Sequence, residues 1–223
     1  MVHDGIVYQI FANQATVFAL DDRSLKDIII PEYVLGRPVT EIADNAFANT
    51  PIRTIKLPKS VVVIGKGAFK NCDYLTGVYQ YGGSQKQDIW IKDFAFFHCK
   101  QLEALQLNPY ITIDGERIFN YCCRLTSLGS SKIRSRSNLW SCVFSECTQL
   151  KELSFIGKEK LKIPDRMFAN CPNLRCLYFW CKVEITEYVK DKLQEIEVYC
   201  NSTSNVLDLA YEGYKVVNME AKK

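Results

Sequence analysis

Apolar residues recur along this chain in a unit of 22 to 27 residues. In five units a cysteine stands three residues after a phenylalanine, and a leucine stands three residues after the cysteine; the first unit has Thr50 in the cysteine position. So many matches in register exceed what chance provides, and the pattern predicts a repeat architecture. The repeated phenylalanines are Phe47, Phe69, Phe96, Phe119, Phe144 and Phe168.

Each unit predicts two short strands joined by a tight turn. The L-x-x-L-x-L stretch has the two-residue period of a strand that buries one face. An upstream aliphatic residue, such as Ile64, Ile91 or Ile163, begins a second extended segment. Between them, A-F-x-N-C predicts a turn in which phenylalanine is the wedge and cysteine fills a narrow corner. One unit cannot bury these faces alone, so we expect a stacked, mainly β solenoid of short parallel strands.

The two ends depart from the repeat and are expected to cap it. Residues 6–11 and 15–20 predict a β-hairpin, and residues 27–30 a third strand. Near the C-terminus the pattern predicts a helix at 186–193, a strand around 196–198, a helix at 204–211 and a closing strand at 214–217. The expected organisation is an N-terminal β cap at residues 1–38, about six repeats at residues 39–182, and a degenerate last repeat with a small α/β C-terminal cap at residues 183–223.

The repeat resembles a known family. The pattern I-x-x-x-A-F-x-x-C-x-x-L-x-x-I-x-L-P-x-S, best seen in Ile42–Ser60 and Ile64–Val78, is similar to the bacterial BspA-like (Treponema-type) leucine-rich repeat. The resemblance extends over residues 39–200, although the units after Gly82 lose the L-P-x-S ending. It implies a right-handed leucine-rich-repeat solenoid and a role in adhesion or protein interaction, often at a cell surface.

The charge balance argues against two classes of partner. The chain has 28 basic and 25 acidic residues, a formal charge of +3. So small an excess is unlike a basic nucleic-acid module or a polybasic membrane anchor. The N-terminus lacks the features of a signal peptide, and no apolar run approaches the ~20 residues that span a bilayer. We therefore expect a cytoplasmic protein without a membrane partner; the alternative is a cell-surface or secreted protein whose signal has been removed.

Cysteine is the unusual component, with ten residues against two histidines. Stacked units would place the repeat cysteines about 4.8 Å apart, within reach of a disulfide, but a small buried apolar residue is the simpler interpretation. The other cysteines have irregular spacing, no C-x-x-C occurs, and no nucleotide-binding, protease or hydrolase motif is present. The sequence predicts no metal, no cofactor and no enzymatic activity. The repeat cysteines are Cys72, Cys99, Cys122, Cys147 and Cys171.

The strand alternation also predicts which side chains face outward. One predicted column reads Lys56, Tyr79, Gln106, Gly129, Ser154 and Tyr178; the upstream strands give Glu41, Val63, Trp90, Thr112 and Lys162. Exposed aromatic residues on a rigid surface are the usual anchors of protein interfaces. We therefore expect two partner-binding clusters, unless these rings pack under the nearby insertion or the caps. The first cluster is Tyr79, Tyr81 and Trp90, and the second is Tyr178 and Trp180.

A basic turn provides a third candidate. Lys132, Arg134 and Arg136 have no acidic residue close in sequence and could contact a phosphate or an acidic partner; the alternative is a solvated turn. Taken together, the sequence predicts a non-catalytic protein-binding scaffold. The alternatives are a surface adhesin and an accessory subunit that contacts nucleic acid through this turn.

Overall fold

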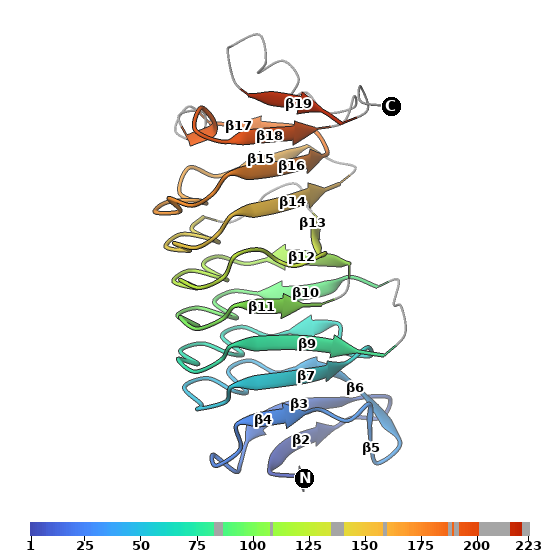
Figure 1. The fold of residues 1–223 in the computed structure, drawn as a ribbon. Coiled ribbons are helices and arrows are strands. Elements are labelled where there is room, and N and C mark those ends of the chain that lie inside the picture. Colours follow the sequence, from blue (N-terminus) through green and yellow to red (C-terminus); the bar gives the residue numbers. More distant parts are fainter. Residues whose placement is uncertain are drawn as a thin grey trace.

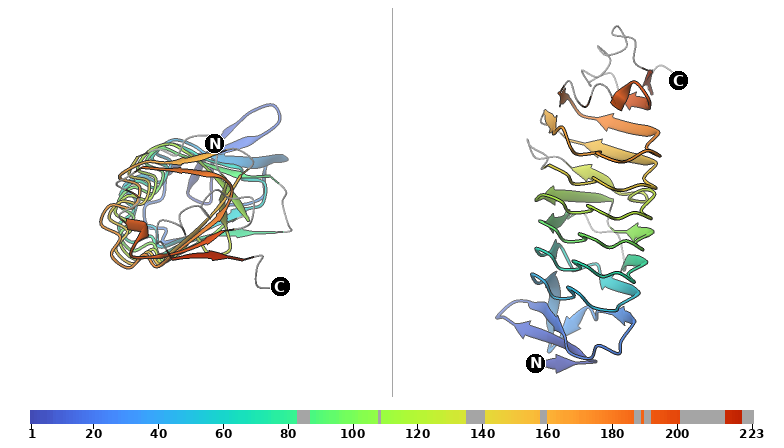
Figure 2. Two further views of the ribbon diagram at one scale, coloured as in Figure 1. Left: turned by 90° about the horizontal axis from the view of Figure 1, so that it is seen from above. Right: turned by 90° about the vertical axis from the view of Figure 1, so that its left-hand side faces the viewer.

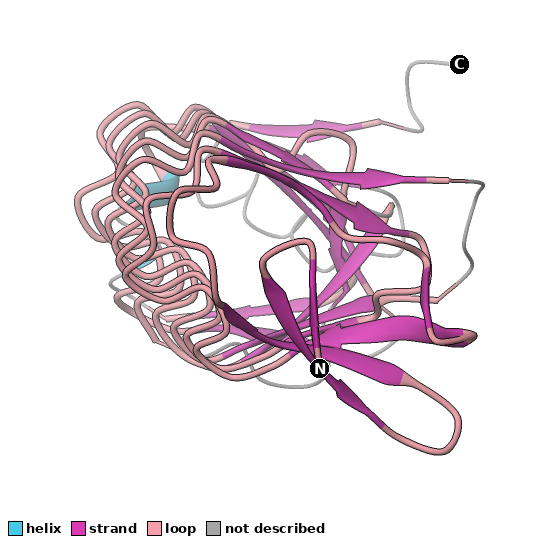
Figure 3. Ribbon diagram, turned by 90° about the horizontal axis from the view of Figure 1, so that it is seen from below, coloured by secondary structure: helices cyan, strands magenta, loops and turns pink. Residues whose placement is uncertain are grey.

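The computed structural model describes residues 1–82, 87–107, 109–134, 141–157, 160–186, 189, 192–200 and 215–219. The chain forms an elongated solenoid whose turns stack from the N-terminus to the C-terminal end (Figure 1). Seen along the axis, the turns superpose, with the loops gathered on one side of the coil and the strands on the other (Figures 2 and 3). The predicted solenoid of short parallel strands is confirmed.

An antiparallel cap covers the N-terminal end. β1 (Val2–His3) pairs with β2 (Ile6–Ile10), which forms the predicted hairpin with β3 (Ala15–Leu20). β5 (Tyr33–Val34) forms a second hairpin with β6 (Arg37–Ile42). β3 then pairs in parallel with β6, so the cap continues directly into the first turn of the solenoid.

The first half of the solenoid has two parallel sheets. The upstream strands β6, β8 (Val63–Ile64), β10 (Ile89–Lys92) and β12 (Tyr110–Asp114) form one. The downstream strands β4 (Asp27–Ile29), β7 (Thr54–Pro58), β9 (Gly77–Tyr81) and β11 (Ala104–Gln106) form the other. Each unit therefore contributes two strands, as its sequence predicts.

The arrangement changes at the fourth unit. Leu128 is followed by Gly129, which has φ of 60° and lies in a turn, so no downstream strand forms there. Instead, β13 (Lys132–Arg134) pairs with β12 on one side and with β14 (Glu152–Ile156) on the other. The large sheet thus passes from upstream to downstream strands and continues through β16 (Cys176–Trp180), β18 (Glu197–Cys200) and β19 (Val216–Asn218). β15 (Leu161–Ile163) and β17 (Val183–Ile185) form a separate pair.

The repeated phenylalanines form a buried stack, here called the phenylalanine ladder. Consecutive ring centroids are 5.1 to 5.4 Å apart from Phe47 to Phe144, and the last step, to Phe168, opens to 6.5 Å. The residue two positions after each phenylalanine has a left-handed backbone, with φ of 55° to 64° in all six units. Asparagine tolerates this conformation better than most residues, which explains the asparagine of the A-F-x-N-C turn.

The repeat cysteines form a second ladder beside the first. Each thiol donates a hydrogen bond to the carbonyl oxygen of the phenylalanine one unit earlier, with sulfur–oxygen distances of 3.0 to 3.2 Å. In the first unit, the hydroxyl of Thr50 donates to the Phe47 carbonyl at 2.6 Å. All ten cysteines are free thiols in this structure. Cysteine therefore acts here as a small buried residue that also donates a hydrogen bond.

The predicted C-terminal elements are only partly within the described residues. Residues 189, 192 and 193 are helical, inside the helix predicted at 186–193, and β18 and β19 are strands near the positions expected. The helix predicted at 204–211 lies outside the described residues, as does position 214, where the closing strand was expected to begin.

Candidate functional site

Outward-facing positions of the large sheet align in one column across seven strands. The predicted alignment from Glu41 to Thr112 is confirmed by the strand register. The expected continuation to Lys162 is wrong, because β13 enters the sheet and brings Arg134 opposite Thr112. Lys162 instead pairs with Glu184 on the separate two-stranded sheet. The observed column reads Glu41, Val63, Trp90, Thr112, Arg134, Ile156 and Trp180.

A neighbouring column brings further aromatic residues to the same region. Tyr110 lies opposite Lys132, and Tyr178 lies opposite both Ser154 and Tyr199. The column predicted to run from Lys56 to Tyr178 included Gly129. That position is wrong, because Gly129 lies in a turn. The rings of Tyr178 and Tyr199 stack with centroids 4.8 Å apart, and Tyr199 donates a hydrogen bond to Glu197 at 2.6 Å, which raises the pKa of Tyr199 to about 12.

Two predicted candidates, the basic turn and the second aromatic cluster, lie together. The Lys132 ammonium lies 4.9 Å from the centre of the Trp180 ring, and the Arg134 guanidinium lies 4.5 Å from the centre of the Tyr110 ring. Such cation–π contacts hold long side chains in place on a surface. We call this group the aromatic–cationic face; its members, all half-buried, are Tyr110, Lys132, Arg134, Tyr178, Trp180 and Tyr199.

An acidic residue from an earlier unit lies at one edge of this face. Asp88 Oδ2 is 2.9 Å from Arg134 Nε and accepts a hydrogen bond from the buried Thr112 hydroxyl at 3.0 Å. The basic turn has no acid close in sequence, but the fold brings Asp88 beside it. A phosphate would have to compete with Asp88 for Arg134. Arg136 lies outside the described residues.

The first predicted aromatic cluster is divided between the two sheets. Tyr79 lies on β9, aligned with Lys56 and Gln106 as predicted, whereas Trp90 lies on β10 of the large sheet. The Tyr81 hydroxyl donates to the Ile30 carbonyl at 2.6 Å, so this ring is fastened to the N-terminal cap. The three residues therefore come from two sheets, and Trp90 shares a column with Trp180.

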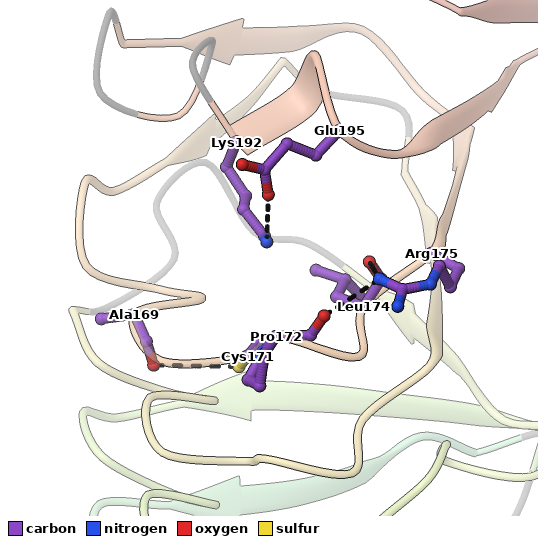
Figure 4. A network of polar contacts seen from close by, with 7 residues as sticks. All are labelled: Ala169, Cys171, Pro172, Leu174, Arg175, Lys192 and Glu195. Carbon is purple, nitrogen blue, oxygen red and sulfur yellow. Dashed lines mark hydrogen bonds and ion pairs between the residues drawn. The ribbon is translucent and has the colours of Figure 1, made fainter.

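A hollow lies where the phenylalanine ladder ends. Val189 and Lys192 follow Phe168 and Cys171 by 21 residues each, slightly less than one repeat, and line a space of about 650 Å³ with them. Figure 4 shows Lys192 reaching down toward the level of Cys171 while it pairs with Glu195 at 2.8 Å. The hollow marks where valine replaces the larger phenylalanine at the end of the repeat.

The chemistry of the described residues offers little to a metal or a nucleophile. Across the described ranges, no group of three histidine, cysteine or acidic side chains is placed to hold a metal ion. Burial raises the pKa of Cys72, Cys171 and Cys181 to about 11, and holds those of Cys99, Cys122 and Cys147 well above 9.0. These thiols therefore stay protonated at neutral pH. Within the same ranges, no helix is long and apolar enough to cross a membrane.

Comparison with known proteins identifies the repeat. A family model for the BspA type leucine rich repeat region matches six copies, over residues 14–81 and 84–197. The chain belongs to this family. A crystal structure of the T. pallidum leucine rich repeat protein resembles this BspA-type chain with a TM-score of 0.63 at 20% identity, covering 97% of both chains. At that identity the likeness establishes the fold alone.

Two further solved structures resemble this BspA-type protein more distantly. A leucine-rich repeat protein from Bacteroides capillosus is 26% identical over 54% of this chain and 90% of its own, with a TM-score of 0.43. A leucine rich cell surface protein from Faecalibacterium prausnitzii is 16% identical over 90% of this chain and 72% of its own, with a TM-score of 0.46. Comparison with curated proteins finds no match.

Three members of the site were missed in the sequence. Tyr110 lies two residues before Thr112 of the predicted column, and Tyr199 directly follows the strand predicted around 196–198, so continuing the alternation would have found both. Asp88 directly precedes β10 and has no periodic signal; only the fold brings it to Arg134.

Proposed function

We propose that this BspA-type protein is a non-catalytic scaffold that binds a partner protein through the aromatic–cationic face. The observation that carries the proposal is the gathering of four aromatic rings and two cations on adjacent strands of one sheet. Tyrosine, tryptophan and arginine are the residues most enriched among the energetic anchors of protein interfaces. Solenoids supply the extended, rigid surface on which such anchors act.

The charge pattern favours a protein partner over nucleic acid. Arg134 is already balanced by Asp88. Glu197 lies on β18 with Tyr199, and Glu152 lies on β14, which pairs with the strand that carries Tyr178. A nucleic-acid site would instead need a surplus of cations along a phosphate path. A partner that offers an apolar patch beside one or two acidic residues would match both the rings and Lys132.

Alanine substitution at Trp180 tests this proposal. The partner would first be captured from a lysate of the native host and identified, and its affinity for the purified full chain would then be measured. The Trp180 ring contacts the Lys132 ammonium and lies opposite Ile156 on the neighbouring strand. We therefore expect Trp180→Ala to weaken binding by at least ~30-fold, which corresponds to a hot spot of about 2 kcal/mol. Tyr79→Ala, on the other sheet, is the matched control.

The outcome separates the candidate surfaces. Unchanged affinity in Trp180→Ala and Tyr178→Ala, with both proteins folded by circular dichroism, would contradict the proposal. A loss confined to Tyr79→Ala would assign binding to the β7–β9–β11 sheet instead. Trp90→Ala extends the test along the observed column, and a salt-sensitive gel shift lost in Lys132→Ala would favour the nucleic-acid alternative.

We also propose that the protein functions in a reducing compartment such as the cytoplasm. The support is the cysteine ladder, in which each buried sulfur donates its proton to a carbonyl. A disulfide between neighbouring rungs would remove two of these donors. Ten titratable thiols in unfolded protein isolated from the native host would agree with this proposal, whereas paired ladder cysteines would favour the surface-adhesin alternative.

A further inference from the structure

A small hollow lies beside the aromatic–cationic face, where the fourth unit lacks a downstream strand. The chain turns at Gly129, and a space of about 180 Å³ remains open between this turn and the first residues of β14. We call it the serine–glutamate hollow; its polar residues are Ser127, Ser131, Glu152, Ser154 and Tyr178. Small-molecule pockets usually exceed ~300 Å³, so this hollow suits one side chain of a partner rather than a whole ligand.

The polar side chains described around the serine–glutamate hollow all end in oxygen. Glu152 contributes a carboxylate, and the serines and Tyr178 contribute hydroxyls. The Ser127 hydroxyl accepts the Gly129 N–H at 3.2 Å, which fixes it at the edge of the turn. Leu128 and Leu153, each 3% exposed, add apolar walls. The described walls include no lysine, arginine or histidine, so the hollow offers hydrogen-bond acceptors and a negative charge to the group that enters it.

The strand register places a second carboxylate near the same tyrosine. Glu152 lies opposite Cys176, and Cys176 lies opposite Glu197 on the next strand. Tyr178 follows Cys176 by two residues and shares its face of the sheet, so its ring lies beside both carboxylates. The pKa of Tyr178 is raised, first by burial and then by its neighbours, which include Glu152 and Glu197. The register and the pKa both place negative charge around this ring.

Tyr178 differs from the other rings of the aromatic–cationic face in having no cation of its own chain. Lys132 lies over Trp180, and Arg134 lies over Tyr110. Tyr178 instead stacks on Tyr199, and among the described residues no lysine or arginine lies over either ring. Glu152 is exposed and forms no ion pair with a described residue. The face therefore lacks a cation at the position where its negative charge is concentrated.

A guanidinium group matches this position better than an ammonium group. It is planar and stacks on an aromatic ring, and it donates two parallel N–H groups to a carboxylate. Its remaining N–H groups would meet the serine hydroxyls, which accept hydrogen bonds. The apolar stem of an arginine would lie along Leu128 and Leu153, as long cationic side chains do on apolar surface.

We propose that the serine–glutamate hollow receives an arginine side chain of the partner protein, which stacks on Tyr178 and pairs with Glu152. The inference rests on the proposed function, because it assigns one residue of the partner that the aromatic–cationic face binds. Such a partner presents an arginine to Glu152 and an acidic residue to Lys132, so the two charges fix its orientation on the face.

A nuclear magnetic resonance titration of the full-length chain tests the proposal without the partner. The probes are arginine, lysine and citrulline, each capped as the N-acetyl methylamide; citrulline keeps the shape of arginine but has no charge. We expect capped arginine to bind with a dissociation constant of about 1 mM, as one charge-assisted pair permits, and to shift the amide resonances of Ser127 and Gly129. Capped lysine and capped citrulline should bind at least ~5-fold more weakly.

Glu152→Gln should weaken the binding of capped arginine at least ~5-fold, and it should fold normally because Glu152 is exposed. The matched control is Glu184→Gln on β17, which removes the same charge from the separate two-stranded sheet and should keep full affinity. Trp180→Ala should keep it too, so failure here is distinguishable from failure of the proposed scaffold function. Equal binding of the three probes, tighter binding of capped lysine, no binding, or unchanged affinity in Glu152→Gln would overturn the proposal.

Discussion

The thiol of each ladder cysteine has two structural roles. It fills a corner too narrow for a larger side chain, and it donates to the phenylalanine carbonyl of the preceding unit. That carbonyl also accepts the backbone N–H of the cysteine in its own unit, so both of its lone pairs are used. Thr50 stands in the cysteine position of the first unit, and its hydroxyl donates instead to the Phe47 carbonyl of its own unit.

The protonated ladder makes stability sensitive to alkaline pH. Burial raises the pKa of Cys72 from 9.0 to about 11. Since the unfolded thiol ionises first, its contribution is fully present below pH 9 and is lost as the pH rises to 11. We expect the melting temperature to fall between pH 9 and pH 10.5. In Cys72→Thr, which keeps a donor that does not ionise, the fall should be smaller; an equal fall in both proteins would contradict this role of the thiol.

At the scale of the elements, the close stacking of successive turns depends on Gly65. A Cβ atom there would lie 2.7 Å from the backbone nitrogen of Asp44, while Asp44 Oδ1 accepts the Lys66 N–H at 2.7 Å. The glycine therefore allows one turn to hydrogen-bond onto the previous one. Gly115 has the same relation to Asp93, whose carboxylate accepts the Glu116 N–H at 2.8 Å.

Substitution of Gly65 measures this contact. We expect Gly65→Ala to lower the free energy of unfolding by more than 2 kcal/mol, because overpacking forces the backbone apart. Gly36→Ala is the comparison: Gly36 has φ of 71° but nothing within 4 Å, so alanine should cost only the left-handed strain of about 1–2 kcal/mol. Urea unfolding of both variants gives the two values, and equal losses would remove the stacking contact as the cause.

Strand formation and the core could be predicted from the sequence because they follow the repeat. Phe69, Cys72 and Leu75 are each fully buried in the positions that the pattern assigns. The passage of the large sheet through β13 could not be predicted, because Lys132–Arg134 contains a single buried apolar residue, Ile133, which is too short a signal for a strand. The candidate site depends on that passage: it brings Arg134 opposite Thr112 and Lys132 beside Trp180. Its members were therefore mostly identified, but in separate clusters.

The whole molecule is a rigid rod with different surfaces on different sides. The strands carry the aromatic–cationic face and, on the other sheet, Tyr79, while the loops gather on the opposite side of the coil. Because a solenoid is held mainly by contacts between neighbouring units, a surface substitution in one unit should leave distant units folded. Binding can therefore be assigned to one side at a time.

Site-specific photo-crosslinking in the native host tests the central claim most directly. Ser154 lies opposite Tyr178 in the aromatic–cationic face, and Gln106 is exposed on the other sheet. With p-benzoylphenylalanine placed at Ser154, we expect a crosslink to one partner protein that Trp180→Ala abolishes, and no such crosslink from Gln106. A crosslink from Gln106 alone, or one from Ser154 that survives Trp180→Ala, would contradict the account.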